Sequence, residues 1–295
     1  MKGVFAVVVF ILVMGLFTFA QSNLERAKRE LKRLRDEVAG ANNYKKSDIV
    51  FLLYSSRYGL SSSEFEIEKG FVINFLNTIT VSMEDTRIEV ISFAYSASRY
   101  VDGVSVPSLD KHKCHLVEKF KSLPKGINGN GGNTYGAFKL AYDVCTGKFS
   151  AFKRGPLSLV RTVVILLTAG PWYGQSPVSI AKDLQRANIE VFVIGVRSSF
   201  LEHNLQKMVN NADKQAFYLR NFQEFHELSL FLRKDPSGTK SQNVDANICN
   251  RNCDQLARCV CDLVYATYKC LCPRGYGGSG TLGQCNGKSK SNSYY

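Results

Sequence analysis

The feature that most constrains the fold is a pair of short, almost wholly apolar segments, TVVILLT at 162–168 and EVFVIGV at 190–196. Apolar runs of this length are typical of strands that are covered on both faces, as in a parallel sheet. Two further strand candidates precede them at 49–53 and 87–94. Segments with helical periodicity separate the strands, at 64–76, 113–121, 135–143, 177–186 and 222–232. This alternation predicts an α/β fold with a doubly wound, mostly parallel sheet.

The chain begins with the pattern of a secretion signal. Lys2 supplies a positive start, residues 4–16 are nearly all apolar, and the small residues Thr18 and Ala20 precede an expected cleavage before Gln21. A retained membrane anchor is the alternative, but the apolar run is short against the about 20 residues of a spanning helix. No later segment is apolar enough to span a bilayer. We therefore expect a signal peptide over 1–20 and a secreted, extracellular protein.

The formal net charge is +13, and six of the cations crowd one predicted amphipathic helix at 22–38. They are Arg26, Lys28, Arg29, Lys32, Arg33 and Arg35, and they belong to a lead-in segment over 21–46. In an extracellular protein such charge points to acidic glycans or an anionic matrix rather than to nucleic acid. A basic helix that is merely solvated explains the pattern equally well.

The nine cysteines fall into two groups. Cys114 and Cys145 lie on consecutive predicted helices of the α/β region, and we expect them to pair. The other seven are Cys249, Cys253, Cys259, Cys261, Cys270, Cys272 and Cys285. The segment 249–285 is too poor in aliphatic residues to bury a core, so disulfides must hold it together. A linker over 234–248 precedes it, and a basic tail over 286–295, with Lys288 and Lys290, follows it.

Three phrases resemble one family. SDIVFLLYSS at 47–56, GGNTYG at 131–136 and VVILLTAG at 163–170 are similar to the metal-site loops of von Willebrand factor A domains. KRLRD, FQEFHEL and CDLVYATYKCLCPRGYGGSG extend the likeness to the N-terminal region of sushi, von Willebrand A, EGF and pentraxin-containing proteins. The resemblance implies a von Willebrand factor A domain over 47–233 and an EGF-like module over 249–285.

In that family the loops hold a divalent cation through an Asp-x-Ser-x-Ser set, a threonine and a second aspartate. The matching positions here are Tyr54, Ser56, Tyr58, Thr134 and Ala169. Both carboxylates are replaced, and two neutral hydroxyls cannot offset the dehydration of Mg²⁺. We therefore expect a degenerate metal site and no cofactor, with Ser56 and Thr134 forming turn hydrogen bonds instead.

Aromatic residues dominate these loops, and we regard Tyr54, Tyr58, Trp172 and Tyr173 as a candidate binding surface. A tryptophan that simply packs into the fold is an equally open interpretation for Trp172.

The family resemblance also implies a disulfide pairing for the tail. It joins Cys249 to Cys259, Cys253 to Cys270 and Cys272 to Cys285, which leaves Cys261 over. Cys261 is then unpaired or bonded to another chain. Because six cysteines allow 15 connectivities, a different pairing stays open.

No catalytic pattern is present: the chain lacks a phosphate-binding loop, a nucleophile elbow and a complete zinc ligand set. We expect a secreted, noncatalytic adhesion or extracellular matrix protein that binds matrix proteins or acidic glycans. The alternative is a soluble secreted effector of a venom or of immune recognition.

Overall fold

The computed structural model describes residues 23–39, 46–76, 79, 81, 86–101, 113–125, 131–148, 160–197, 199–233, 258–262, 267–272, 276–279, 281 and 285–288. The predicted signal peptide, the linker over 234–248, and Cys249, Cys253 and Lys290 lie outside these residues. Among the described helices, none combines the length and the apolar character that crossing a bilayer requires.

One six-stranded sheet forms the centre of the molecule, with the strand order β3-β2-β1-β4-β5-β6. All neighbouring strands run parallel except β3, which pairs antiparallel with β2 at one edge. The strands are β1 (Lys46–Tyr54), β2 (Thr86–Phe93), β3 (Ala97–Val101), β4 (Val160–Thr168), β5 (Glu190–Val196) and β6 (Ala216–Leu219). The predicted doubly wound, mostly parallel sheet is confirmed.

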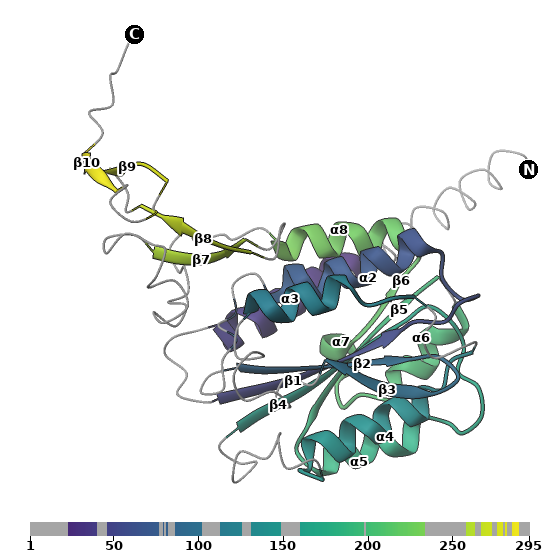
Figure 1. Cartoon of the computed structure of the whole chain (residues 1–295). Coiled ribbons are helices and arrows are strands. Elements are labelled where there is room, and N and C mark those ends of the chain that lie inside the picture. Colours follow the sequence, from purple (N-terminus) through teal and green to yellow (C-terminus); the bar gives the residue numbers. More distant parts are fainter. Residues whose placement is uncertain are drawn as a thin grey trace, which may run out of the picture.

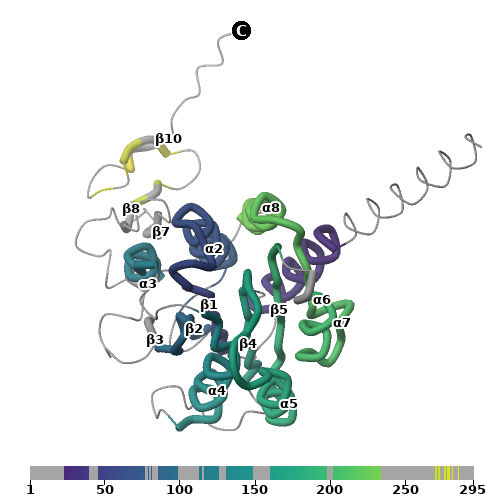
Figure 2. The backbone as a smooth tube through the Cα atoms, turned by 90° about the vertical axis from the view of Figure 1, so that its right-hand side faces the viewer, coloured from purple at the N-terminus to yellow at the C-terminus, as the bar shows by residue number. Residues whose placement is uncertain are grey.

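Helices cover both faces of this sheet (Figures 1 and 2). One layer consists of α2 (Ser62–Phe75), α3 (Lys113–Lys121) and α8 (Phe222–Arg233). The other contains α4 (Thr134–Cys145) and α5 (Val178–Arg186). Two shorter helices, α6 (Ser199–Gln206) and α7 (Ala212–Gln215), accompany β6. Because both faces are covered, the central strands need apolar side chains in both directions.

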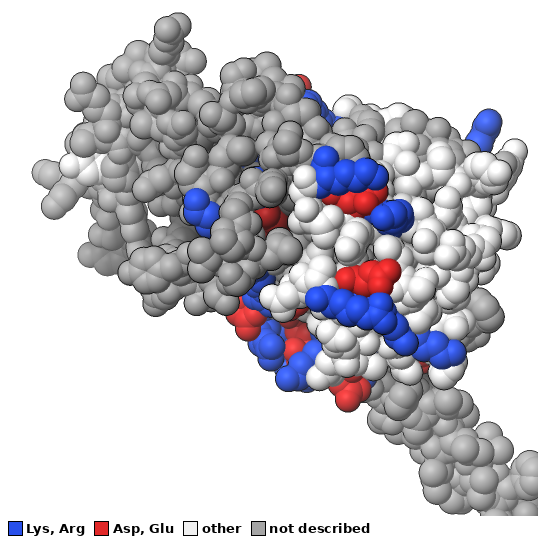
Figure 3. Space-filling view, turned by 90° about the horizontal axis from the view of Figure 1, so that it is seen from below, with Lys and Arg blue, Asp and Glu red and all other residues white. Residues whose placement is uncertain are grey.

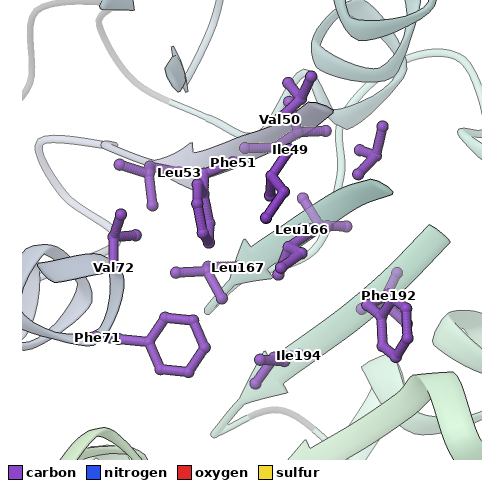
Figure 4. Close-up of a cluster of buried hydrophobic side chains, with 14 of the residues drawn as sticks. Ile49, Val50, Phe51, Leu53, Phe71, Val72, Leu166, Leu167, Phe192 and Ile194 are labelled. Atoms are coloured by element: carbon purple, nitrogen blue, oxygen red, sulfur yellow. The ribbon is translucent and has the colours of Figure 1, made fainter. Parts of the chain in front are cut away.

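The core lies between the sheet and the α2 layer and continues on the opposite face (Figure 4). Phe51 of β1 contacts Phe75 of α2 edge to face, with ring centroids 5.7 Å apart. Phe71 of α2 in turn meets Phe225 of α8 at 5.2 Å. These aromatic contacts join the helices of one layer to the central strand.

Two helices that begin at the carboxyl end of the sheet have clear start signals. Ser61 and Glu64 form a reciprocal capping box at the start of α2. Asn133 caps α4 by accepting the backbone N–H of Gly136 at 2.8 Å. Such side chains satisfy N–H groups that a helix leaves unpaired, so they fix where each loop ends.

In the tail, β7 (Arg258–Asp262) pairs antiparallel with β8 (Thr267–Leu271), and β9 (Tyr276–Gly277) pairs with β10 (Asn286–Lys288). A disulfide joins Cys272 to Cys285, as the family resemblance implied.

The expected pairing of Cys114 with Cys145 is wrong. Cys145 is a buried free thiol, whereas Cys114 is disulfide-bonded. The two could not meet because α3 and α4 lie on opposite faces of the sheet (Figure 2). All other cysteines follow residue 248, so the disulfide of Cys114 ties the α/β domain to the tail. With Cys145 free, the other eight cysteines are an even number, so Cys261, which the family pairing leaves over within the tail, need not stay unpaired.

Candidate functional site

The loops that the sequence singled out meet at the carboxyl end of the parallel strands. Leu53 of β1 lies beside Leu167 of β4, so Tyr54 and the residues that follow it stand next to the end of β4 and Ala169. A pocket of about 1020 Å³ opens there, and we call it the top-face pocket. Its tyrosines and polar side chains are Tyr54, Tyr58, Tyr95, Tyr135, Tyr173, Ser56, Asn133, Gln175 and Arg197.

Tyr54 forms the floor of this pocket and is only 3% exposed. Its phenol lies against Gly59 and Gly170, where an added Cβ at Gly170 would stand 3.1 Å from the hydroxyl. Burial raises the pKa of Tyr54, and a hydrogen bond with Ser56 partly opposes that rise. The residue at the position of the family's first aspartate is therefore a neutral aromatic ring held between two glycines.

The serine and threonine hydroxyls of the expected metal loops lie in the protein interior. The Ser56 hydroxyl accepts the backbone N–H groups of Gly59 and Gly131, each at 3.3 Å. Thr134 is 2% exposed, and the side chain of Ala169 offers no ligand atom. Within the described residues, no carboxylate lines the pocket, and no group of three His, Cys, Asp or Glu side chains gathers at any point. Ser56 thus serves as the loop hydrogen-bonding residue that the sequence suggested.

Three tyrosines stand exposed around the floor. Tyr58 and Tyr95 are each 78% exposed, and Tyr173 is 63% exposed. Trp172 differs, because it is half-buried and packs against the core. Of the four aromatic residues predicted to form a surface, only Tyr58 and Tyr173 are exposed to a partner. Tyr54 forms the floor of the pocket, and Trp172 packs against the core.

Glycines allow the loops to approach each other closely. A Cβ at Gly132 would lie 2.8 Å from the carbonyl oxygen of Pro171, so only glycine fits there. Gly131 has a φ of 101°, which other residues rarely adopt. The carbonyl of Gly132 also accepts the Tyr173 N–H at 2.9 Å. The loop that starts α4 and the loop that follows β4 therefore form one connected wall of the pocket.

Arg197 supplies the only charged side chain among the described residues that line the pocket. It directly follows β5 and has a φ of 79°, an uncommon value for a residue with a side chain. Its Nη2 lies 3.0 Å from Glu64 Oε1 and donates to the Gly59 carbonyl at 3.4 Å. The guanidinium also lies over the Phe222 ring, 5.2 Å from its centroid.

The second candidate surface, the basic helix at 23–39, lies at the opposite end of the sheet. Leu24, Ala27, Leu31 and Leu34 are buried in the core. Arg26 donates to the Ala216 carbonyl at the start of β6. Arg161, near the start of β4, donates from Nη1 to Oε2 of Glu37 in this helix at 2.7 Å. The helix therefore packs across the amino end of the strands.

All six of the cations counted in this helix are engaged. Arg26 pairs with Asp213, Lys28 with Glu227 and Glu25, and Arg35 donates to the Leu232 carbonyl. The others pair within the helix: Arg29 and Arg33 contact Glu30, and Lys32 contacts Asp36. These six residues therefore form no free basic stripe, and because Lys28 and Arg35 are buried, the helix is not merely solvated either.

The view of the molecule from below shows the same pattern on another face. Most lysines and arginines there adjoin acidic residues (Figure 3). Lys139 and Lys148 show the same kind of pairing, since both contact Asp143 at 3.1 Å. The formal charge of the chain is therefore not spread over the described part of this face as an unbroken basic patch.

Tyr95, Gln175 and Arg197 line the pocket and were not predicted from the sequence, whereas Asn133 and Tyr135 lie within the GGNTYG phrase. A signal existed for two of them. Tyr95 closely follows β2 and Arg197 directly follows β5, and ligands in parallel sheets bind beyond the carboxyl ends of the strands.

Comparison with known proteins places these features in a family context. The sequence profile of the von Willebrand factor type A domain matches residues 48–230. Sushi, von Willebrand factor type A, EGF and pentraxin domain-containing protein 1 from Mus musculus is 28% identical over 282 residues, covering 90% of this chain. Matrilin-3 from Mus musculus is 26% identical over 192 residues, covering 65% of this chain. The chain spans only 7% and 38% of the lengths of these two curated relatives.

Among solved structures, proximal thread matrix protein 1 from the mussel byssus superposes with a TM-score of 0.53. The two sequences are 18% identical, and the match covers 64% of this chain and 45% of that one. At this level of identity the likeness concerns the fold alone.

Proposed function

The chain belongs to the von Willebrand factor type A domain family, and from that premise we propose that it is a secreted, noncatalytic adhesion or matrix protein. Its top-face pocket binds another extracellular macromolecule without the help of a bound cation. The observation that carries this proposal is the place of Tyr54. A buried phenol stands where the family's metal site begins, while exposed tyrosines surround it.

The replacement of both carboxylates argues against metal-dependent binding. A divalent cation needs oxygen ligands that compensate for the water it sheds, and carboxylate charge supplies most of that compensation. Tyr54 is a neutral phenol at physiological pH, and burial raises its pKa further, while Ala169 has no polar side-chain atom. The Ser56 hydroxyl already accepts two backbone N–H groups. We infer that the loops close over the former site and present a preformed surface.

The composition of the pocket suits a macromolecular partner. Tyrosine supplies large, rigid contact area at a low cost in conformational entropy, and serine, asparagine and glycine supply adaptable polar contacts. Exposed tyrosines such as Tyr58, Tyr95 and Tyr173 are enriched at protein interfaces and rarely gather on a surface without a partner. This favours a protein over an acidic glycan, since the cations of the 23–39 helix are already paired.

The relatives support an extracellular setting. Matrilin-3 shares the domain, and the alignment with the sushi, von Willebrand factor type A, EGF and pentraxin protein covers more of the chain than residues 48–230. That longer match supports an EGF-like character for the tail, in which Cys272 and Cys285 are joined. The tail would then act as a second small module of a matrix component.

Binding of the secreted protein to decellularised connective matrix tests this function. We expect binding that EDTA does not reduce, and a decrease of about tenfold or more when Tyr58→Ala and Tyr173→Ala are combined. Tyr276→Ala is the matched control, because Tyr276 is an exposed tyrosine of the tail. Loss of binding in EDTA, or full binding by the double variant, would contradict the proposal.

A further inference from the structure

We propose that Arg197 anchors a carboxylate of the bound protein, so that the top-face pocket recognises an acidic side chain flanked by apolar or aromatic residues. This inference rests on the proposed function and names the chemistry of its ligand. A guanidinium would then supply, from the protein itself, the positive charge that holds the ligand.

The position of Arg197 fits this role. It is the only charged residue in the described lining of the pocket, and its side chain is 47% exposed. Its charge acts on the Tyr54 hydroxyl, whose pKa it helps to lower against the larger effect of burial. A cation therefore lies close to the floor of the pocket and still reaches solvent.

The guanidinium is oriented on one side and open on the other. Nη2 contacts Glu64 and the Gly59 carbonyl, and 47% of the side chain stays exposed to solvent. Glu64 is itself fixed, because its Oε2 accepts the Ser61 N–H at 2.7 Å in the capping box of α2. An arginine held in this way has lost much of its side-chain freedom before a ligand arrives, and it keeps donors for a charge-assisted hydrogen bond.

Charge complementarity selects the ligand. The lining that the structure describes contains one arginine and no carboxylate, and Glu64 contacts this arginine from outside the lining. An anionic group that enters the pocket therefore meets a guanidinium and no carboxylate among these lining residues. A sulfated glycan carries anionic groups along its whole length and needs several cations to bind. The described lining offers a single cation among five tyrosines, which matches one carboxylate within an otherwise apolar protein segment.

A pair of peptides tests the proposal. The probes are Ac-Gly-Phe-Asp-Gly-NH2 and its Asn counterpart, titrated into the secreted full chain and followed by NMR. We expect the Asp peptide to bind about tenfold more tightly than the Asn peptide, because the charge-assisted hydrogen bond is lost in the amide. Raising the salt concentration should reduce this preference.

Three variants separate the explanations. Arg197→Gln should abolish the preference for Asp while leaving binding of the Asn peptide unchanged, which also shows that the pocket remains folded. Arg197→Lys should retain part of the preference. Tyr58→Ala should weaken both peptides alike, because it removes contact area rather than charge.

Three results would contradict a role of Arg197 in binding the carboxylate, and two further results would separate this inference from the proposed function. Equal binding of the two peptides, absence of binding by both, or an undiminished Asp preference in Arg197→Gln would overturn the role of Arg197. A heparin oligosaccharide that binds more tightly than the Asp peptide and is lost in Arg197→Gln would overturn the protein ligand in favour of a glycan. If Tyr58→Ala and Tyr173→Ala abolish matrix binding but Arg197→Gln does not, the proposed function survives and this inference fails.

Discussion

The two ends of the sheet use their unusual residues in opposite ways. At the amino end, the chain gathers cations that the sequence presents as candidates for contacting partners, and the structure engages them internally. Arg35 is 1% exposed, and Cys114 is bonded to the tail. At the carboxyl end, aromatic residues that would ordinarily fill a core stand in solvent, as Tyr58 and Tyr95 do.

The contrast shows that residue type alone does not identify a binding surface. A buried cation that a carboxylate or carbonyl already holds is not available to a partner, and an aromatic ring belongs to the core only when other residues cover it. Asp48 and Arg87 illustrate the first point at the amino end, where they form a buried bidentate pair with distances of 2.9 and 2.7 Å. The carboxyl end, with one partly exposed arginine, is the better candidate for recognition.

The largest expected effect concerns the covalent tie at the amino end. Limited proteolysis within 234–248 should leave the domain and the tail joined on a non-reducing gel and separate them on reduction. Cys114→Ser should separate them under both conditions, whereas Cys145→Ser should behave as wild type because Cys145 is free. We expect peptide mapping to identify Cys261 as the partner, since the family pairing leaves it over. Recovery of Cys114 as a free thiol would contradict the claim that this cysteine joins the domain to the tail.

Next in size is the contribution of the basic helix to stability. Arg35→Ala should lower the free energy of unfolding by about 3 kcal/mol, because it removes a buried side chain that donates to the Leu232 carbonyl. Arg29→Ala is the matched control and should cost less than about 0.5 kcal/mol, since Arg29 is 68% exposed. Urea unfolding measures both. Similar losses in the two variants would mean that the helix is not held through Arg35.

A smaller effect is expected from Glu68, which lies near the pocket floor on α2. Its side chain is fully buried, neither oxygen has a partner among the described residues, and burial together with Glu64 raises its pKa well above 4.5. The folded state therefore binds this proton more tightly than the unfolded state, so its stability falls as the pH rises above about 4.5 and levels off beyond the folded pKa.

Glu68→Gln should remove this pH dependence. The difference in thermal unfolding temperature between wild type and variant should move in favour of the variant from pH 4 to pH 7.5. A constant difference across that range would show that Glu68 titrates normally and that the floor of the pocket is not a neutral, dry environment.

Much of the fold could be predicted, because the central strands carry an unambiguous pattern. The segment 190–196 coincides with β5, and 113–121 coincides with α3. The edge strands β3 and β6 were missed since they are short and, in β3, partly polar, which leaves too few residues for a periodic signal. The disulfide of Cys114 could not be predicted, because the spacing of residues along the chain does not reveal which helix covers which face of the sheet.

The site was predicted in part for a similar reason. Motif spacing brought Tyr54, Ser56 and Ala169 together correctly, because each follows or ends a strand of the parallel sheet. Arg197 carries no motif. Its importance depends on β5 ending near the same pocket and on Glu64 orienting the guanidinium, and only the three-dimensional arrangement contains that information.

Calorimetric titration of the secreted protein with Mg²⁺ and Mn²⁺ tests the central claim most directly, namely that the carboxyl end of the sheet is a cation-independent binding surface. We expect no heat of specific binding from the wild type, because Tyr54 and Ala169 provide no carboxylate. The combined variant Tyr54→Asp and Ala169→Asp should gain binding and serves as the positive control. A specific site of micromolar affinity in the wild type, lost when Ser56 is changed to alanine, would contradict the account.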